Sequence, residues 1–305
     1  MKHNDFCLLM FYWNYFDRKS LLNNFHIAYS CYKETTPHVK VVEVAKKGCF
    51  HLNVPDVIRL TSDQCLWQKE RVVNHVARNF TDEYKYIAYV DADLIFTDPD
   101  WIDKTKRVLQ EPNSVVQPFS KVHYLPKGHT RYHGVSVAAT LSLSKQVKDM
   151  GGNDSFTAEF LTKRVKHAAP GGAWAMRLED LRKHPIYDLS VIGGGDTLQS
   201  YLLLGVPLGR AKKVHDHLLE DIGALEATYS RWMGYREVLG IDQDVIHINH
   251  GSSFNRQYAS RNSVLGLLDV TKELKESEGL YRYVGSNPKF KSDIELFFDN
   301  RNEDD

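Results

Sequence analysis

Two aspartates, Asp91 and Asp93, follow an apolar run and carry the strongest chemical signal in the sequence. The run, residues 86–90, consists of Tyr, Ile, Ala, Tyr and Val, which predicts a buried strand. Strand side chains repeat with period two, so both carboxylates are expected on one side. When two carboxylates lie so close together, their repulsion raises the pKa of one of them unless a cation lies between them. The pair therefore predicts a site for Mn²⁺ or Mg²⁺, hard cations that also bind diphosphate oxygens; the alternative is a pair of turn or capping residues.

The elements that must position this pair alternate between strand and helix patterns. Strands are predicted at 6–12, 39–44, 86–95 and 115–119, and helices at 17–32, 65–79 and 97–110. Asp17 is expected to cap the first of these helices. Such alternation predicts an α/β fold with a mainly parallel sheet. Ligands of open α/β sheets bind at the carboxyl ends of strands, where the aspartate pair is placed.

Composition sets the broad class of the protein. The chain has 305 residues, 42% hydrophobic and 26% charged, which is typical of a globular domain. The formal net charge is zero, so bulk charge does not indicate a nucleic-acid or anionic-membrane partner. The four cysteines lack metal-type spacing and are expected as reduced thiols. No run has the length of a membrane span, and residues 6–13 are interpreted as a strand instead of a signal peptide, which predicts a cytoplasmic location.

Two regions are less regular. Residues 120–152 include a basic stretch, interpreted either as a solvated loop or as a mobile element that contacts phosphate or acceptor. No sharp domain boundary is visible, so a single catalytic domain is predicted over 1–265. A charged extension over 266–305 is expected to fray at its end.

The segments 66–71, with Asn74, and 90–96 resemble glycosyltransferases of the A-type fold. The Asp-x-Asp motif of those enzymes holds a divalent cation on the diphosphate of a nucleotide sugar. The resemblance implies one domain of that fold, a nucleotide-diphospho-sugar transferase-like α/β domain with a mixed, mainly parallel sheet flanked by helices. It implies that Asp93 binds the metal directly and that Asp91 contacts the metal or the ribose and base. Arg71 and Asn74 would line the nucleotide pocket, the alternative for Arg71 being a surface helix charge.

A second block, residues 170–177 and 192–196, resembles the C-terminal half of galactosyltransferase-like catalytic domains. The resemblance implies that a turn of small residues lets the backbone approach the donor sugar, the matching positions being Gly171, Gly172, Ala173 and Trp174. It also implies that Asp196 faces the acceptor as a general base. The sequence departs from the family here, because Thr197 follows where many relatives carry a second acid. Asp196 would also serve as a helix N-cap, and Glu179 and Asp180 are the fallback carboxylates.

A third block, residues 244–251 with 255–258, is similar to the His-x-x-His-Gly and Asn-Arg-x-Tyr ending of the same enzymes. A histidine in this region completes the metal shell in several of them, which implies His247 or His250 as a ligand and leaves the choice open. Nitrogen ligands suit Mn²⁺ better than Mg²⁺. Arg256 is expected either to pair with the diphosphate or to form a salt bridge.

These blocks predict a metal-dependent glycosyltransferase that moves a sugar from a nucleotide-diphosphate donor, with UDP expected, to a hydroxyl acceptor. The acceptor is expected to be a glycan or a bacterial surface polysaccharide. A phage or viral enzyme that acts on hydroxymethylated DNA bases, or one with a small-molecule acceptor, is the alternative within this class. Two other classes stay open: a haloacid-dehalogenase-like phosphohydrolase and a non-catalytic protein that binds nucleotide sugars or glycans.

Overall fold

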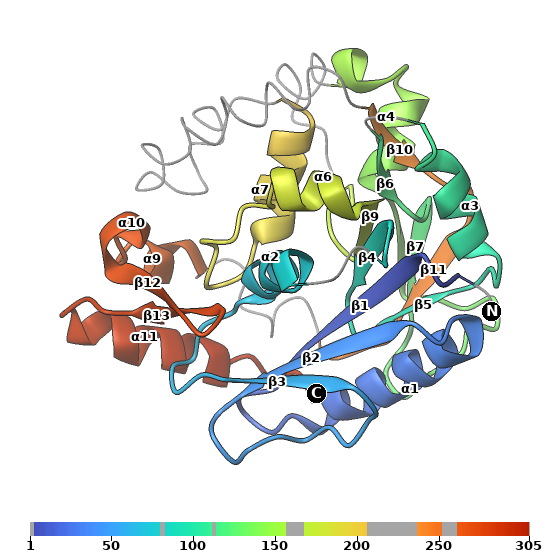
Figure 1. The fold of residues 1–305 in the computed structure, drawn as a ribbon. Helices are drawn as coiled ribbons and strands as arrows, with labels where there is room; N and C mark the ends of the chain where they lie inside the picture. The colour runs from blue at the N-terminus through green and yellow to red at the C-terminus, as the bar shows by residue number, and fades with distance from the viewer. Residues whose placement is uncertain are drawn as a thin grey trace.

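The computed structural model describes residues 3–79, 83–111, 114–156, 168–205, 237–251 and 261–304. Its main sheet contains these strands: β1 (Phe6–Trp13), β2 (Val39–Ala45), β3 (Val57–Thr61), β4 (Tyr86–Val90), β6 (Ser114–Gln117), β9 (Ala173–Arg177) and β10 (Glu237–Gly240). Within the described residues their order is β10-β6-β9-β4-β1-β2-β3 (Figure 1). Every neighbouring pair is parallel except the two that β9 makes. The predicted α/β class, with a mixed and mainly parallel sheet, is confirmed.

Helices cover both faces of this sheet (Figure 1). They are α1 (Lys19–Thr35), α2 (Lys69–Asn79), α3 (Trp101–Val108), α4 (Leu143–Asp149), α6 (Leu178–Lys183), α7 (Gly195–Leu203), α9 (Arg261–Leu265), α10 (Val270–Glu273) and α11 (Pro288–Asp299). Alternate residues of β1 enter two separate cores: Leu9 packs with α2, α7 and α11, whereas Leu8 packs with α1 and α3. No helix in the described part of the chain is long and apolar enough to cross a membrane.

A second, smaller sheet has the order β5-β11-β7-β8 and contains β5 (Leu94–Phe96), β7 (Lys121–Tyr124), β8 (Ala138–Leu141) and β11 (Asp244–His247). The single strand predicted over 86–95 is therefore wrong. The chain leaves β4, turns at residues 91–93, where the Leu94 N–H bonds the Asp91 carbonyl at 3.3 Å, and enters the other sheet as β5. The stretch 120–152, expected to be irregular, contains β7, β8 and α4.

The start of α1 also differs from the prediction. The helix begins at Lys19, and Asp17 does not cap it. Asp17 has a left-handed φ of 54°, and its carboxylate lies 2.7 Å from the His51 ring nitrogen. Tertiary contact with a distant histidine has therefore replaced the local capping bond.

The C-terminal region is integrated into the fold. A hairpin, β12 (Leu274–Ser277) and β13 (Leu280–Tyr283), precedes α11. Buried side chains such as Leu280 and Phe298 belong to the same core as Leu9 of β1. Glu303 is 7% exposed, so the expected fraying of the chain end is wrong.

Candidate active site

A cavity of about 450 Å³ opens where β4 ends and β9 begins. Because β9 runs antiparallel to β4, Ala173 pairs with Val90, and the Asp91 N–H donates to the Gly172 carbonyl at 2.8 Å. The topology thus places the Gly171-Gly172 turn beside the aspartate pair. Among the residues that line this cavity are Lys69, Asp91, Asp93, Gly171, Gly172, Gly194, Asp196, His247, His250, Arg261, Arg301 and Glu303.

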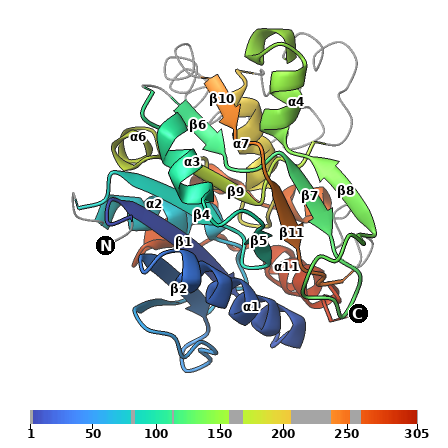
Figure 2. The same cartoon turned by 90° about the vertical axis from the view of Figure 1, so that its right-hand side faces the viewer.

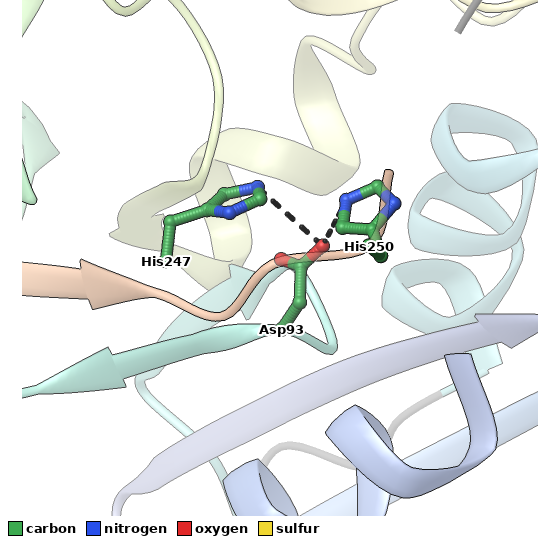
Figure 3. A group of neighbouring side chains, drawn as sticks. All are labelled: Asp93, His247 and His250. Carbon is green, nitrogen blue, oxygen red and sulfur yellow. Dashed lines mark ion pairs between the residues drawn. The ribbon is translucent and has the colours of Figure 1, made fainter. Parts of the chain in front are cut away.

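Asp93, His247 and His250 form a cluster that has the composition of a metal site (Figure 3). One ligand atom from each lies within 4.8 Å of the others. The Asp93 Oδ2 atom is 2.8 Å from Nε2 of His250 and 3.6 Å from Nε2 of His247. β11 pairs antiparallel with β5, and the Ile248 N–H donates to the Asp93 carbonyl at 2.9 Å, which fixes the histidines opposite the aspartate. One carboxylate and two imidazoles fit Mn²⁺ better than Mg²⁺.

Asp91 faces a different partner from Asp93. The Lys69 ammonium lies 3.0 Å from Oδ1 of Asp91 and 2.9 Å from Oδ2 of Asp196, so it joins the two carboxylates. Burial alone would lower the pKa of Lys69, but the Asp196 and Asp91 charges raise it well above its usual value. Burial raises the pKa of Asp91 to about 6; Lys69 opposes this shift, and the charges of Asp196 and Asp93 reinforce it. Strand periodicity predicted that Asp91 and Asp93 point to the same side. Because the chain turns at residues 91–93, the two side chains have different partners instead.

Glu70 adds a further buried carboxyl group. It is 4% exposed and lies against the start of α7, where a Cβ added to Gly195 would overlap the Glu70 Cδ atom. Burial raises the pKa of Glu70 to about 8, against the lowering effect of Lys69. Lys69 and Glu70 lie within the segment 66–71 but were not predicted as site residues, because charged residues in a helix are ordinarily exposed.

The Gly171-Gly172 turn packs against Asp196. A Cβ added to Gly171 would lie 2.6 Å from the Asp196 Oδ2 atom, and Gly172 has a left-handed φ of 92°. Ala173 and Trp174 are buried in the sheet and do not line the cavity in the described part of the chain; the Trp174 indole donates to the Pro170 carbonyl at 2.9 Å.

Arg71 and Asn74 face away from the cavity. The Arg71 guanidinium lies 3.4 Å from Asp188 and donates to the Gly279 carbonyl, and Asn74 bonds Asp188 at 2.8 Å. Positions 69 and 71 of α2 are two residues apart and do not share a face, so the helix that presents Lys69 to the cavity turns Arg71 toward the β12–β13 hairpin. Glu179, which is exposed, and Asp180 are on α6 and do not line the cavity either. Arg256 lies outside the described residues.

Two arginines that the sequence patterns did not indicate, Arg261 and Arg301, line the cavity. A Cβ added to Gly194 would lie 2.8 Å from Cζ of Arg261, so this glycine gives the guanidinium its room. The cavity lining also has an aromatic wall, in which Trp13 and Trp67 pack edge to face at 5.7 Å between ring centres. The cavity thus contains guanidinium groups that can bind an anion and flat apolar side chains that can contact a ring.

No family model and no curated protein sequence matches this chain. Solved structures of similar fold include a mannosyltransferase from Pyrobaculum calidifontis in complex with GDP-Man and Mn²⁺, at 10% identity, covering 94% of this chain and 68% of that one, with a TM-score of 0.41. The glucosyl-3-phosphoglycerate synthase of Mycobacterium tuberculosis, in complex with phosphoglyceric acid, has 10% identity, coverage of 88% and 80%, and a TM-score of 0.40. The catalytic domain of a Drosophila β1,4-galactosyltransferase, in complex with xylobiose, has 15% identity, covers 77% of this chain and has a TM-score of 0.33. This chain spans 63% of the length of that galactosyltransferase domain.

Proposed function

We propose that this protein is a divalent-metal-dependent glycosyltransferase of the A-type fold that uses a nucleotide-diphosphate sugar, with UDP as the expected nucleotide. One observation carries the proposal: a single cavity gathers the cluster of Asp93, His247 and His250 with the Lys69-bound carboxylate of Asp196. The first group supplies ligands for a cation, and the second supplies a carboxylate that can face a sugar hydroxyl. This combination fits group transfer from a diphosphate better than either group alone.

The donor half of the site would bind the diphosphate and the nucleoside. Asp93, His247 and His250 would hold Mn²⁺ or Mg²⁺, which when bound neutralises charge on the departing nucleoside diphosphate. Arg261 and Arg301, which line the cavity, would donate N–H groups to phosphate oxygens. The aromatic wall offers a flat surface to a base or sugar ring.

The acceptor half would use Asp196. The bond from the sugar C1 to the phosphate oxygen breaks, and the electron pair leaves with the diphosphate. A new bond forms between C1 and the acceptor oxygen, and in an inverting reaction Asp196 takes the hydroxyl proton. In a retaining reaction the same carboxylate would position the acceptor instead.

Metal binding and donor turnover together test the proposal. Calorimetric titration with Mn²⁺ should show one site in the wild-type protein and lose it in Asp93→Ala. Asp98→Asn is the matched control, because Asp98 follows β5 and pairs with Lys104 outside the cavity lining. Incubation with a panel of sugar nucleotides and Mn²⁺ should then release a nucleoside diphosphate from one donor.

The outcomes separate the classes that the sequence left open. Turnover that survives strong chelation would make the metal assignment wrong. Donor binding without turnover on any acceptor would indicate a binding protein. Release of inorganic phosphate from a phosphomonoester, with no sugar transfer, would favour a phosphohydrolase.

For the acceptor we propose a glycan hydroxyl, with hydroxymethylated DNA as the testable alternative. The segment between β7 and β8 exposes Lys127, His129, Arg131 and His133. If these residues follow a phosphate backbone, DNA binding should weaken steeply with salt. Absence of DNA binding at low salt would remove the DNA alternative and leave the glycan.

A further inference from the structure

The end of the chain, residues 299–304, passes along the rim of the cavity, and we call it the C-terminal strap. Two of its side chains, Arg301 and Glu303, line the cavity beside His250. In Figure 2 the C-terminus lies near the end of β11, the strand that leads to the two histidines. The strap is therefore adjacent to the proposed metal ligands although it is remote from Asp93 in the sequence.

The strap is fastened at several points. Arg18 donates to the Asp299 carbonyl at 2.6 Å, and the Ser20 N–H donates to the Asp304 carboxylate at 2.7 Å. The Ser20 hydroxyl also donates to the Glu303 carbonyl at 2.5 Å. A Cβ added to Gly251 would lie 2.6 Å from the Asn302 carbonyl oxygen, so the strap packs directly on the residue after His250. These contacts fix its backbone against the start of α1 and the segment that follows β11.

Glu303 lies on the far side of His250 from Asp93. The Glu303 Oε1 atom is 3.5 Å from Nδ1 of His250, whereas Nε2 of the same ring is 2.8 Å from Asp93. Glu303 is 7% exposed, and the Arg301 guanidinium lies 2.7 Å from the same Oε1 atom. The two nitrogens of His250 thus face two different carboxylates, that of the proposed metal ligand Asp93 and, on the other side of the ring, that of Glu303.

A histidine ligand binds a cation through one neutral nitrogen, and the partner of the other nitrogen decides the tautomer and the ring orientation. A carboxylate behind Nδ1 favours the proton on Nδ1 and leaves the lone pair on Nε2. Arg301 compensates the buried charge of Glu303, which lowers the cost of keeping that carboxylate ionised. Asp93, His250 and Glu303 thus lie in series, with the His250 ring between the two carboxylates.

We propose that Glu303 is a positioning residue that orients His250 for metal binding, so that the C-terminal strap is part of the metal site. This inference rests on the proposed function, because it assumes that Asp93, His247 and His250 bind the cation. It assigns Glu303 no direct metal bond. A role confined to pairing with Arg301 would leave metal affinity unchanged when Glu303 is altered.

The test is the Mn²⁺ affinity of purified variants, measured by calorimetry without any donor or acceptor. Glu303→Ala should weaken binding about 10- to 100-fold, the usual effect of losing such a supporting carboxylate. Glu303→Gln should weaken binding less, because an amide oxygen at this position can take a proton donor at Nδ1 without the carboxylate charge. Asp293→Asn is the matched control, since Asp293 pairs with Lys289 on α11 away from the cavity lining.

A second readout needs no metal and covers the case in which Glu303→Ala fails to fold. Nitrogen NMR of the His250 ring should show the proton on Nδ1 in the wild-type protein, a mixture of tautomers in Glu303→Ala, and a smaller shift toward that mixture in Glu303→Gln. Unchanged tautomer and unchanged Mn²⁺ affinity in a folded variant would overturn this inference alone. A wild-type protein that binds no divalent cation would overturn the proposed function itself.

Discussion

Lys69 gives Asp91 and Asp93 different roles in the site. The ammonium binds Asp91 and Asp196 together, while Asp93 turns to the histidines. A buried cation between two carboxylates stabilises both ionised forms at once. We therefore propose that Asp93 is the metal ligand of the pair and that Asp91 is a bridge to the acceptor side.

Replacing Lys69 tests this bridge. Lys69→Met should leave two half-buried carboxylates without a shared cation. The loss of one partner of a fully buried ion pair costs about 3–5 kcal/mol, and the cost here should be smaller because both carboxylates keep contact with solvent. Thermal unfolding should show a fall in Tm, and sugar transfer should fall with it. Lys69→Arg, which keeps the charge, is the control and should recover part of both. An unchanged Tm in the methionine variant would show that the ion pairs contribute little.

Asp196 is tested by a change that preserves its shape. Asp196→Asn should reduce kcat for transfer by about 10²- to 10⁴-fold, the range for loss of a general base. Donor affinity, measured by titration of the sugar nucleotide with Mn²⁺, should stay within about twofold, since the proposed diphosphate contacts come from other residues. Asp180→Asn is the matched control on α6. If that variant loses transfer and Asp196→Asn does not, the base has been assigned to the wrong carboxylate.

At the scale of elements, the antiparallel direction of β9 brings the Gly171-Gly172 turn next to the aspartate pair. Its first residue lies beside the last residue of β4, which brings Gly172 to the Asp91 backbone. A parallel strand in that position would have presented its other end to this edge. The Gly171-Gly172 turn owes its place in the site to strand direction and to the small size of both residues.

The two glycines should respond differently to alanine. Gly171→Ala would place a methyl group 2.6 Å from the Asp196 carboxylate, which must then move, so kcat should fall at least tenfold with little change in Mn²⁺ affinity. Gly172→Ala would force alanine into a left-handed φ of 92°, at a cost of about 1–2 kcal/mol. Steady-state kinetics and thermal unfolding of both variants make the comparison. A Gly171→Ala enzyme with wild-type kcat would mean that Asp196 tolerates displacement.

At the scale of the whole molecule, the buried charges around α2 make stability depend on pH. Glu70 has its pKa raised by burial from 4.5 to about 8, so the folded state holds its proton over a range where the unfolded state has lost it. The stabilisation from this group is fully present below about pH 4.5 and is lost as the pH rises toward 8. Asp91, with its pKa raised to about 6, acts in the same direction over a lower range.

The Glu70→Gln substitution should remove most of the dependence of folding stability on pH. Unfolding by denaturant between pH 5 and pH 8.5, without added metal, should show wild-type stability falling by a few kcal/mol and the variant changing much less. Glu179→Gln, on the exposed part of α6, is the control and should follow the wild-type curve. Parallel curves for Glu70→Gln and wild type would show that Glu70 is not the group responsible.

Local patterns predicted the elements well where one physical rule dominates. The apolar runs of β1, β2 and β4 agree with the sequence expectation, because burial is encoded within a few residues. The alternative role of Asp196 as an N-cap is wrong, because α7 begins at Gly195 and Gly194 holds the cap position without a side-chain bond. The prediction failed at residues 91–93, where the chain changes sheets, and at Asp17, which bonds His51 instead of capping α1. Both failures come from partners far along the chain.

The sequence by itself determined the alternation of strands and helices, the apolar run that precedes Asp91, and the aspartate pair as a candidate cation site. Residue type and short spacing are sufficient for these, since they depend on side-chain chemistry and on period. A histidine ligand, His247 or His250, followed only from the resemblance to glycosyltransferases of the A-type fold, which left the choice open. The tertiary structure alone decided that Asp93 meets the histidines while Asp91 meets Lys69, that Arg71 and Asn74 turn away, and that Glu303 of the C-terminal strap reaches His250. These pairings join residues from separate sheets, helix faces and the chain end, and only the direction and register of packed elements fix such distances.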